Sequence, residues 1–165
     1  MSKTEKNLKE AFAGESQANR KYLAFAERAD RDGFRQAARL FRAAAAAETV
    51  HAHAHLRVLK GIGTTEENLK EAIEGETHEF KSMYPDMVTA AQEEGNAAAE
   101  RSFKFAMEVE ELHANMYRKM LENLEAGGRE YPYYICPVCG FTAEEEAPEN
   151  CPVCGAKGSV FQRVE

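Results

Sequence analysis

The sequence Glu48-Thr49-Val50-His51 recurs 62 positions later as Glu110-Glu111-Leu112-His113. In each copy the Glu and the His are three residues apart, and this spacing places both side chains next to each other on one face of a helix. Each motif also follows a phenylalanine by a whole number of heptads, so the same face carries apolar residues. The repeat therefore predicts two related helices whose buried sides each carry a carboxylate and an imidazole.

The helical pattern extends outward from these motifs over most of the chain. Apolar residues at helical spacing predict four helices, over residues 4–31, 34–60, 65–94 and 96–125. Ser2-x-x-Glu5 and Thr64-x-x-Glu67 fit capping boxes at two of the helix starts. Pro85 predicts a bend in the third helix.

The last part of the chain has a different composition. Four of the five prolines and all four cysteines follow residue 131. Proline is poorly tolerated inside helices, so this part is expected to be rich in turns. The break is expected at Ala126-Gly127-Gly128, which divides the chain into a helical domain over residues 1–128 and a small domain over residues 129–165.

The overall composition restricts the class of protein. The chain has 165 residues, 44% of them hydrophobic and 30% charged, with a formal net charge of −7. It can therefore form a packed core and is not disordered. No run approaches the roughly 18 apolar residues of a membrane span, and no apolar signal segment follows the N-terminus. We therefore expect a cytoplasmic protein that does not bind a membrane. The negative charge and the lack of a Lys/Arg block argue against nucleic acid as a partner.

The helical part is an internal repeat with one irregularity. Leu8-Lys9-Glu10-Ala11 recurs as Leu69-Lys70-Glu71-Ala72, at an offset of 61 residues. From Tyr22 and Tyr84 onward the offset becomes 62, so one residue has been inserted between the two registers. Two copies indicate two related helix pairs rather than a solenoid, which needs more copies.

Polar residues on the apolar faces of these helices predict a metal centre. Buried carboxylates without partners would cost several kcal/mol each, and these faces carry no stripe of Lys or Arg to neutralise them. Glu oxygens with His nitrogens and no sulfur suit iron or manganese, and the arrangement is typical of di-metal carboxylate bundles. The alternative is a solvated charged face, which the duplication of the motif argues against. The predicted ligands, expected to meet in one bundle core, are Glu15, Glu48, His51, Glu76, Glu79, Glu110 and His113.

Glu79 breaks the repeat, because its counterpart at the offset of 61 is Ala18. The extra carboxylate predicts two unequal metal positions, at one of which Glu79 and His51 compete as the charge of the ion changes. Glu79 is also a candidate proton donor. Tyr22 lies one or two helical turns from the ligands and either supplies hydrogen bonds or protons or is a core aromatic.

The cysteines form two copies of one motif, Cys136-Pro137-Val138-Cys139-Gly140 and Cys151-Pro152-Val153-Cys154-Gly155. Each C-x-x-C turn can bring two sulfurs to one ion, and the following glycine allows a left-handed backbone. Four thiolates suit tetrahedral zinc or iron, of which only iron carries an electron. Disulfides are the alternative, and a reducing compartment disfavours them. A small apolar cover is expected from Tyr133, Tyr134, Ile135, Phe141 and Phe161.

Taken together, these motifs make the chain similar to the rubrerythrin family. The similarity runs from about residue 4 to residue 165. It implies a mainly α fold, a ferritin-like four-helix bundle followed by a small rubredoxin-like metal-knuckle domain. It also implies two non-haem irons in a di-iron centre and one iron in the four-cysteine site, where zinc is possible. The stretches that carry it are Ala13-Gly14-Glu15-Ser16-Gln17-Ala18, Glu48-x-x-His51, Glu76-x-x-Glu79 with Met83-Tyr84-Pro85, Glu110-x-x-His113 and the double knuckle.

The resemblance further implies a role for each ligand. Glu48 and Glu110 would bridge the two irons. Glu15 with Glu79 or His51 would complete one iron, and Glu76 with His113 the other. Tyr22 resembles the family's tyrosine next to the ligands.

The function implied by the resemblance is reduction of hydrogen peroxide to water in oxidative-stress defence. Rubredoxin or an NAD(P)H-dependent reductase would supply electrons through the four-cysteine iron. A helix of about 28 residues is roughly 42 Å long, so the knuckle is expected to lie far from its own di-iron centre. The resemblance therefore implies a homodimer, head-to-tail or domain-swapped, in which the four-cysteine iron of one chain approaches the di-iron centre of the other.

Two other functions fit parts of the sequence. A ferroxidase that oxidises ferrous iron for storage explains the helices but leaves the cysteines without a task. A zinc-ribbon binding protein on a helical scaffold explains the cysteines but leaves the Glu and His ligands unused. The sequence leaves open the electron donor, the metal in each site, peroxide or oxygen as the main oxidant, and the oligomeric state.

Overall fold

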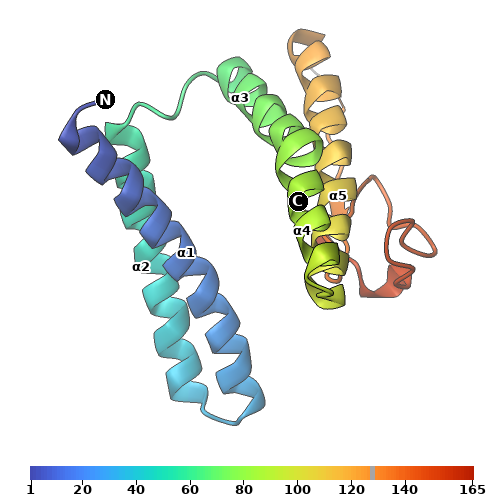
Figure 1. The fold of residues 1–165 in the computed structure, drawn as a ribbon, viewed down its shortest axis with the longest axis horizontal. Helices are drawn as coiled ribbons and strands as arrows, with labels where there is room; N and C mark the ends of the chain where they lie inside the picture. Colours follow the sequence, from blue (N-terminus) through green and yellow to red (C-terminus); the bar gives the residue numbers. More distant parts are fainter. Residues whose placement is uncertain (127–128) are drawn as a thin grey trace. The chain divides into compact units, whose positions relative to one another are not determined.

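Long helices form most of the molecule, and a small antiparallel sheet forms its C-terminal module (Figure 1). This computed structural model describes residues 1–126 and 129–165. The predicted fold class is confirmed: mainly α, with a rubredoxin-like module at the end. Two compact units, residues 1–63 and 64–165, are described separately below. The long helical elements are α1 (Lys3–Arg31), α2 (Arg35–Val58), α3 (Thr65–His78), η1 (Glu79–Met83, a π-helix), α4 (Tyr84–Glu93) and α5 (Ala97–Glu122).

The first unit is an antiparallel hairpin of α1 and α2. The chain reverses at Gly33, whose φ of 84° lies in the left-handed region that glycine adopts without strain. Small side chains make the seam, because alanine lets two helix backbones approach closely. Phe34 precedes Glu48 by two heptads and is therefore expected on the apolar face, but it is 66% exposed and lies outside this seam, so the expectation is wrong at this residue. The buried residues of the hairpin are Ala26, Ala29, Ala38, Ala45 and Ala52.

In the second unit, α3, η1 and α4 form one continuous helical rod that packs along α5 (Figure 1). The rod begins with the predicted capping box: the Thr64 hydroxyl accepts from the Glu67 N–H and the Glu67 carboxylate accepts from the Thr64 N–H. At Ser2 only the first of these two bonds forms, from the Glu5 N–H to the hydroxyl. Gly95, with a φ of 65°, lies at the turn into α5.

The π-helix η1 explains the one-residue irregularity of the repeat. The Tyr84 N–H donates to the carbonyl of Glu79, five residues back, so the turn holds one residue more than an α-helical turn. The offset changes from 61 to 62 between Thr77 and Tyr84, the segment that contains this turn. The sequence predicted a bend in this helix at Pro85. The structure has a wide π-helical turn just before this proline, which has no N–H to donate to the preceding turn.

The C-terminal module contains a three-stranded sheet, in the order β2-β1-β3. Strands β1 (Tyr133–Ile135), β2 (Thr142–Glu144) and β3 (Gln162–Val164) are antiparallel, with Tyr134 opposite Ala143 and Arg163. Short 3-10 turns cover Leu124–Ala126 and Gly158–Val160. Phe141 and Phe161 pack edge to face, with centroids 6.4 Å apart, as part of the predicted apolar cover.

The module belongs to the same unit as α5. Val109 of α5 is 2% exposed, and Gly140 of the module lies against it. The predicted domain boundary at residues 128 and 129 stays a prediction, because Gly127 and Gly128 lie outside the described residues. Within residues 1–126 and 129–165, no helix has the length and apolar character that a membrane span requires.

Candidate metal centres

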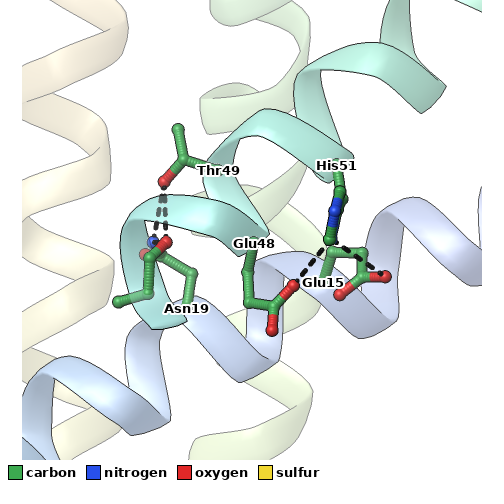
Figure 2. Close-up of polar contacts among 6 residues, drawn as sticks. Glu15, Asn19, Glu48, Thr49 and His51 are labelled. Carbon is green, nitrogen blue, oxygen red and sulfur yellow. Dashed lines mark hydrogen bonds and ion pairs between the residues drawn. The ribbon is translucent and has the colours of Figure 1, made fainter. Parts of the chain in front are cut away.

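Helices α1 and α2 bring together the first set of predicted ligands. Glu15, Glu48 and His51 each offer a ligand atom, and these atoms lie within 4.8 Å of one another. His51 Nδ1 is 2.8 Å from Glu48 Oε2 and 4.0 Å from Glu15 Oε1. Figure 2 shows the three side chains converging from the two helices. Ligand atoms about 2.1 Å from a shared ion would be about 3 to 4 Å apart, so this set fits one metal ion.

A polar clamp holds these two helices together one turn away. Asn19 Nδ2 donates to the Ala45 carbonyl at 2.7 Å and to Thr49 Oγ1 at 2.9 Å (Figure 2). Asn19 lies four residues after Glu15, and Thr49 follows Glu48 directly. The clamp therefore fixes the register of α1 against α2 at the ligands. The sequence analysis missed both residues, because the repeat does not preserve them.

Helices α3 and α5 bring together the second set in nearly the same geometry. The ligand atoms of Glu76, Glu110 and His113 also lie within 4.8 Å of one another. His113 Nδ1 is 2.8 Å from Glu110 Oε2 and 3.8 Å from Glu76 Oε1. The two sets correspond residue by residue in the repeat, which explains their similar shape. Their predicted convergence in a single core stays a prediction, because the two sets belong to separate units.

The second set concentrates negative charge in a half-buried place. Burial and then the charge of Glu110 raise the pKa of Glu76 to about 7. The hydrogen bond to Glu110 raises the pKa of His113, whereas burial lowers it. Without a cation, Glu76 is therefore partly protonated near pH 7, and a bound metal would replace that proton.

Glu79 lies near the second set but outside its three ligands. Burial and then the charge of Glu110 raise the pKa of Glu79. Burial and then the charge of Glu79 raise the pKa of Tyr84, which begins α4 after the π-turn. Tyr117 was missed by the sequence analysis, although it lies four residues after His113. Burial and the charge of Glu76 raise its pKa, so this hydroxyl is also close to the acidic set.

Tyr22 packs in an aromatic cluster of the first unit. Its ring centroid is 6.3 Å from that of Phe25 and 6.2 Å from that of Phe41. This packing fits the core-aromatic alternative, and in the described part of the chain its hydroxyl makes no hydrogen bond. A role for Tyr22 in proton supply therefore stays a prediction.

The four cysteines converge as the two knuckles predict. All four Sγ atoms lie within 4.8 Å of one another, with Cys136 to Cys154 at 3.6 Å and Cys139 to Cys151 at 3.5 Å. A disulfide requires about 2.05 Å, so all four are free thiols. A metal bonded to four sulfurs at about 2.3 Å requires edges of about 3.8 Å, which this set nearly matches.

Backbone amides surround these sulfurs. Burial raises the pKa of Cys136. Hydrogen bonds, including those from the Val138 and Cys139 amides, together lower this pKa by more than burial raises it, so the net shift is downward. The same turn geometry recurs in both knuckles, where Gly140 and Gly155 adopt φ of 85° and 76° and donate their N–H to the first cysteine's carbonyl. The Val138 and Cys139 amides would stabilise the Cys136 thiolate when it binds a metal.

The cysteine module contacts the second ligand set of its own chain. His113 Nε2 lies 2.9 Å from Thr142 Oγ1 of β2. The expectation that the knuckle lies far from its own di-metal ligands is therefore wrong for His113. The helix length misled the prediction: after α5 the chain turns back along the helix, and the Lys119 ammonium donates to Glu144 of β2 at 2.6 Å.

Helix pairs with carboxylate and histidine ligands, joined to a four-cysteine module, define a di-metal carboxylate protein with a rubredoxin-like site. Models of the rubrerythrin family match residues 6–121, and models of its rubredoxin-like domain match residues 134–162. The chain belongs to the rubrerythrin family. Proteins of this family are oxidoreductases, and the chain carries the residues for both of the family's iron cofactors.

Known relatives match along nearly the whole chain. Rubrerythrin-2 of Clostridium acetobutylicum is 37% identical over 174 residues, which cover 94% of this chain and 93% of the relative. Nigerythrin of Nitratidesulfovibrio vulgaris is 36% identical over 165 residues, and the match covers 92% of this chain and 81% of nigerythrin. The solved structure of fully reduced, all-ferrous nigerythrin matches with a TM-score of 0.61 at 32% identity, over 99% of this chain and 88% of that one.

Proposed function

We propose that the chain is a non-haem di-iron peroxidase that reduces hydrogen peroxide to water. The observation that carries this proposal is the hydrogen bond between His113 and Thr142, which links the Glu/His ligands to the cysteine module. In the proposed reaction the two electrons come from a donor through the four-cysteine site, so this site must lie close to the Glu/His ligands. A ferroxidase or a binding scaffold has no use for such a link.

The Glu and His residues would hold two irons, and the cysteines a third. Glu48 and Glu110 would bridge the pair, Glu15 with Glu79 or His51 would complete one ion, and Glu76 with His113 the other. When bound, the pair would supply the two electrons that reduce peroxide, and the four-cysteine iron would be a one-electron carrier. The reaction consumes one peroxide, two electrons and two protons, and it yields two waters.

The chain's own acids would supply the protons. Glu79 is the best-placed donor, because burial and the charge of Glu110 hold its pKa above the ordinary value of a carboxyl group. Tyr84 and Tyr117 stay protonated near the same ligands, since their pKa values are raised. Tyr22 would have the corresponding role at the first set.

The biological setting follows from the same chemistry. Free thiolates favour the reducing cytoplasm, where we place the protein in oxidative-stress defence. Rubredoxin or an NAD(P)H-dependent reductase would reduce the four-cysteine site. We propose a homodimer, head-to-tail or domain-swapped, as the resemblance to the rubrerythrin family implies.

The deciding experiment is a visible spectrum of the protein, reduced without oxygen and then given one equivalent of hydrogen peroxide. We expect ferric-thiolate absorption to return rapidly in a sample with about three irons per chain, two at Glu/His ligands and one at the cysteines. Reoxidation by oxygen but not by peroxide would favour a ferroxidase. A colourless sample with zinc at the cysteines would favour the scaffold.

A further inference from the structure

The cysteine module is attached to α5 by two neighbouring side chains of one strand. Thr142 and Glu144 are two residues apart on β2, so both point to the same face of the sheet. Thr142 meets His113 at 2.9 Å, and Glu144 accepts from Lys119 at 2.6 Å and from the Tyr131 hydroxyl at 2.5 Å. The contacts of Thr142 with His113 and of Glu144 with Lys119 join this strand to α5 at two places, and they hold the hydroxyl of Thr142 at the histidine ring.

Hydrogen-bond direction assigns the tautomer of this histidine. The Thr142 hydroxyl has one hydrogen, and the Gly140 carbonyl lies 3.2 Å away to accept it. Thr142 Oγ1 is then left as an acceptor, so the proton of the shared bond belongs to His113 Nε2. His113 Nδ1, which faces Glu76 and Glu110, is then the nitrogen that can offer a lone pair to a metal ion once the ion replaces the proton shared with Glu110.

The other metal-binding histidine has no such support. In the described part of the chain, His51 contacts Glu48 and Glu15 through Nδ1, and its Nε2 has no hydrogen-bond partner. The side chain of His51 is 55% exposed, against 27% for His113. The repeat has therefore produced two similar ligand sets. Among the described residues, the histidine of the second set has a hydrogen-bond partner at Nε2, and the histidine of the first set has none.

We propose that Thr142 is a positioning residue of the di-metal centre. By accepting the Nε2 proton of His113, it fixes the ring with Nδ1 toward Glu76 and Glu110, and it ties the cysteine module to that ligand. Partners of this kind hold the orientation and tautomer of metal-bound histidines, and their loss typically weakens metal binding about 10- to 100-fold. The inference deepens the proposed function, since it concerns the same site, but it requires metal binding only.

The test uses the full-length protein loaded with zinc, which is closed-shell and gives sharp NMR signals. Histidine nitrogen-15 spectra would be recorded for the native protein, Thr142→Val, Thr142→Ser and a matched control, Thr89→Val. Thr89 lies in the same unit, and within residues 1–126 and 129–165 its hydroxyl bonds only the Pro85 carbonyl of its own helix. The His113 signal is identified by its loss in His113→Gln.

We expect the native protein to show His113 protonated at Nε2, with that proton protected from exchange with water. Thr142→Val should lose the protection and bind zinc at the Glu/His site about 10-fold more weakly. Thr142→Ser and Thr89→Val should retain both. Zinc bound at Nε2 of His113 in the native protein would overturn the proposal without any variant, as would an unchanged protected proton in Thr142→Val.

These outcomes are separate from those of the peroxidase experiment. A protein that fails to turn over peroxide but shows the Thr142-dependent signal retains the positioning role and loses the proposed reaction. A protein that turns over peroxide while Thr142→Val leaves the signal and the zinc affinity unchanged retains the reaction and loses the role of Thr142.

Discussion

At the scale of single residues, the first ligand set depends on an amide that does not touch a ligand. Asn19 bonds to both Ala45 and Thr49 across the hairpin, where α1 and α2 meet through small side chains. Alanine seams allow close approach but resist sliding poorly, because they have no large side chains to interlock. A directional bond at this point sets which residues of the two helices face each other.

We therefore expect Asn19→Ala to destabilise the protein by about 1 kcal/mol, the usual net value of a hydrogen bond. Chemical denaturation followed by far-ultraviolet circular dichroism measures this change. Asn7→Ala is the matched control: it has the same change in helix propensity on the same helix, at an exposed residue without a hydrogen bond in the described part of the chain. Equal effects of the two substitutions would contradict the clamp.

The acidic residues of the second set make a pH prediction. The folded-state pKa of Glu76 is about 7, above its ordinary value of 4.5, and that of His113 is raised above 6.5. Between about pH 5 and about pH 7, the metal-free folded state thus binds more protons than the unfolded state. Its stability is expected to fall as pH rises from about 5 through 7 and above.

Glu76→Gln removes one of these two titrations. The metal-free variant should lose part of the decline in melting temperature between about pH 5.5 and about pH 8, whereas Glu74→Gln, at an exposed position of the same helix, should keep it. Metal binding should show the opposite dependence and strengthen with pH, because the ion displaces these protons. An identical pH profile for Glu76→Gln and the native protein would refute the assignment.

At the scale of elements, the rod of α3, η1 and α4 contains one residue more between Leu69 and Tyr84 than α1 contains between the corresponding residues, Leu8 and Tyr22. The π-turn accommodates this residue at Glu79, next to the ligands, where such turns are frequently found in functional sites. It lets the helix on either side keep its buried face, which a plain insertion would rotate by about 100°.

Deletion of Ser82, an exposed residue inside the π-turn, is expected to convert it to an α-helical turn and to leave both flanking faces in place. The variant should keep its helical circular dichroism and cooperative unfolding. Deletion of Glu74, exposed in the regular helix before Glu76, should instead misalign the ligands and abolish zinc binding by this set. A comparable loss of zinc binding by this ligand set in both deletion variants would show that the wide turn does not accommodate the extra residue.

At the scale of the whole molecule, two kinds of metal site are joined through one histidine. The module that carries the cysteines rests on α5 at Val109, His113 and Lys119. Under the proposed function, electrons that enter at the cysteines would have a short connection to the second ligand set within one chain.

Cys139→Ser should abolish peroxide turnover driven by the natural donor, because the four-cysteine site loses a thiolate. The two irons at the Glu/His ligands should remain, as measured by metal analysis. Val138→Ser, at an exposed position of the same knuckle, is the matched control and should retain turnover. Undiminished donor-driven turnover by Cys139→Ser would mean that electrons bypass the module.

The sequence alone predicted the elements and most of the side chains that converge, because both depend on local spacing. Helix positions followed from apolar periodicity, and the paired C-x-x-C motifs identified all four cysteines that converge. Of the seven predicted Glu/His ligands, six form the two compact sets, since i, i+3 spacing fixes neighbours on a helix. The extra residue of the second repeat was also visible, although its form as a π-turn was not.

Only the tertiary structure decided which distant residues support the ligands. Thr142 lies 29 positions after His113, and Asn19 lies 26 positions before Ala45, so no local pattern could relate them. The exposure of Phe34 and the seating of the cysteine module on α5 are likewise outcomes of packing. Periodicity specifies which side of a helix is apolar, whereas the partner that covers that side is chosen by the fit of side chains across the folded chain.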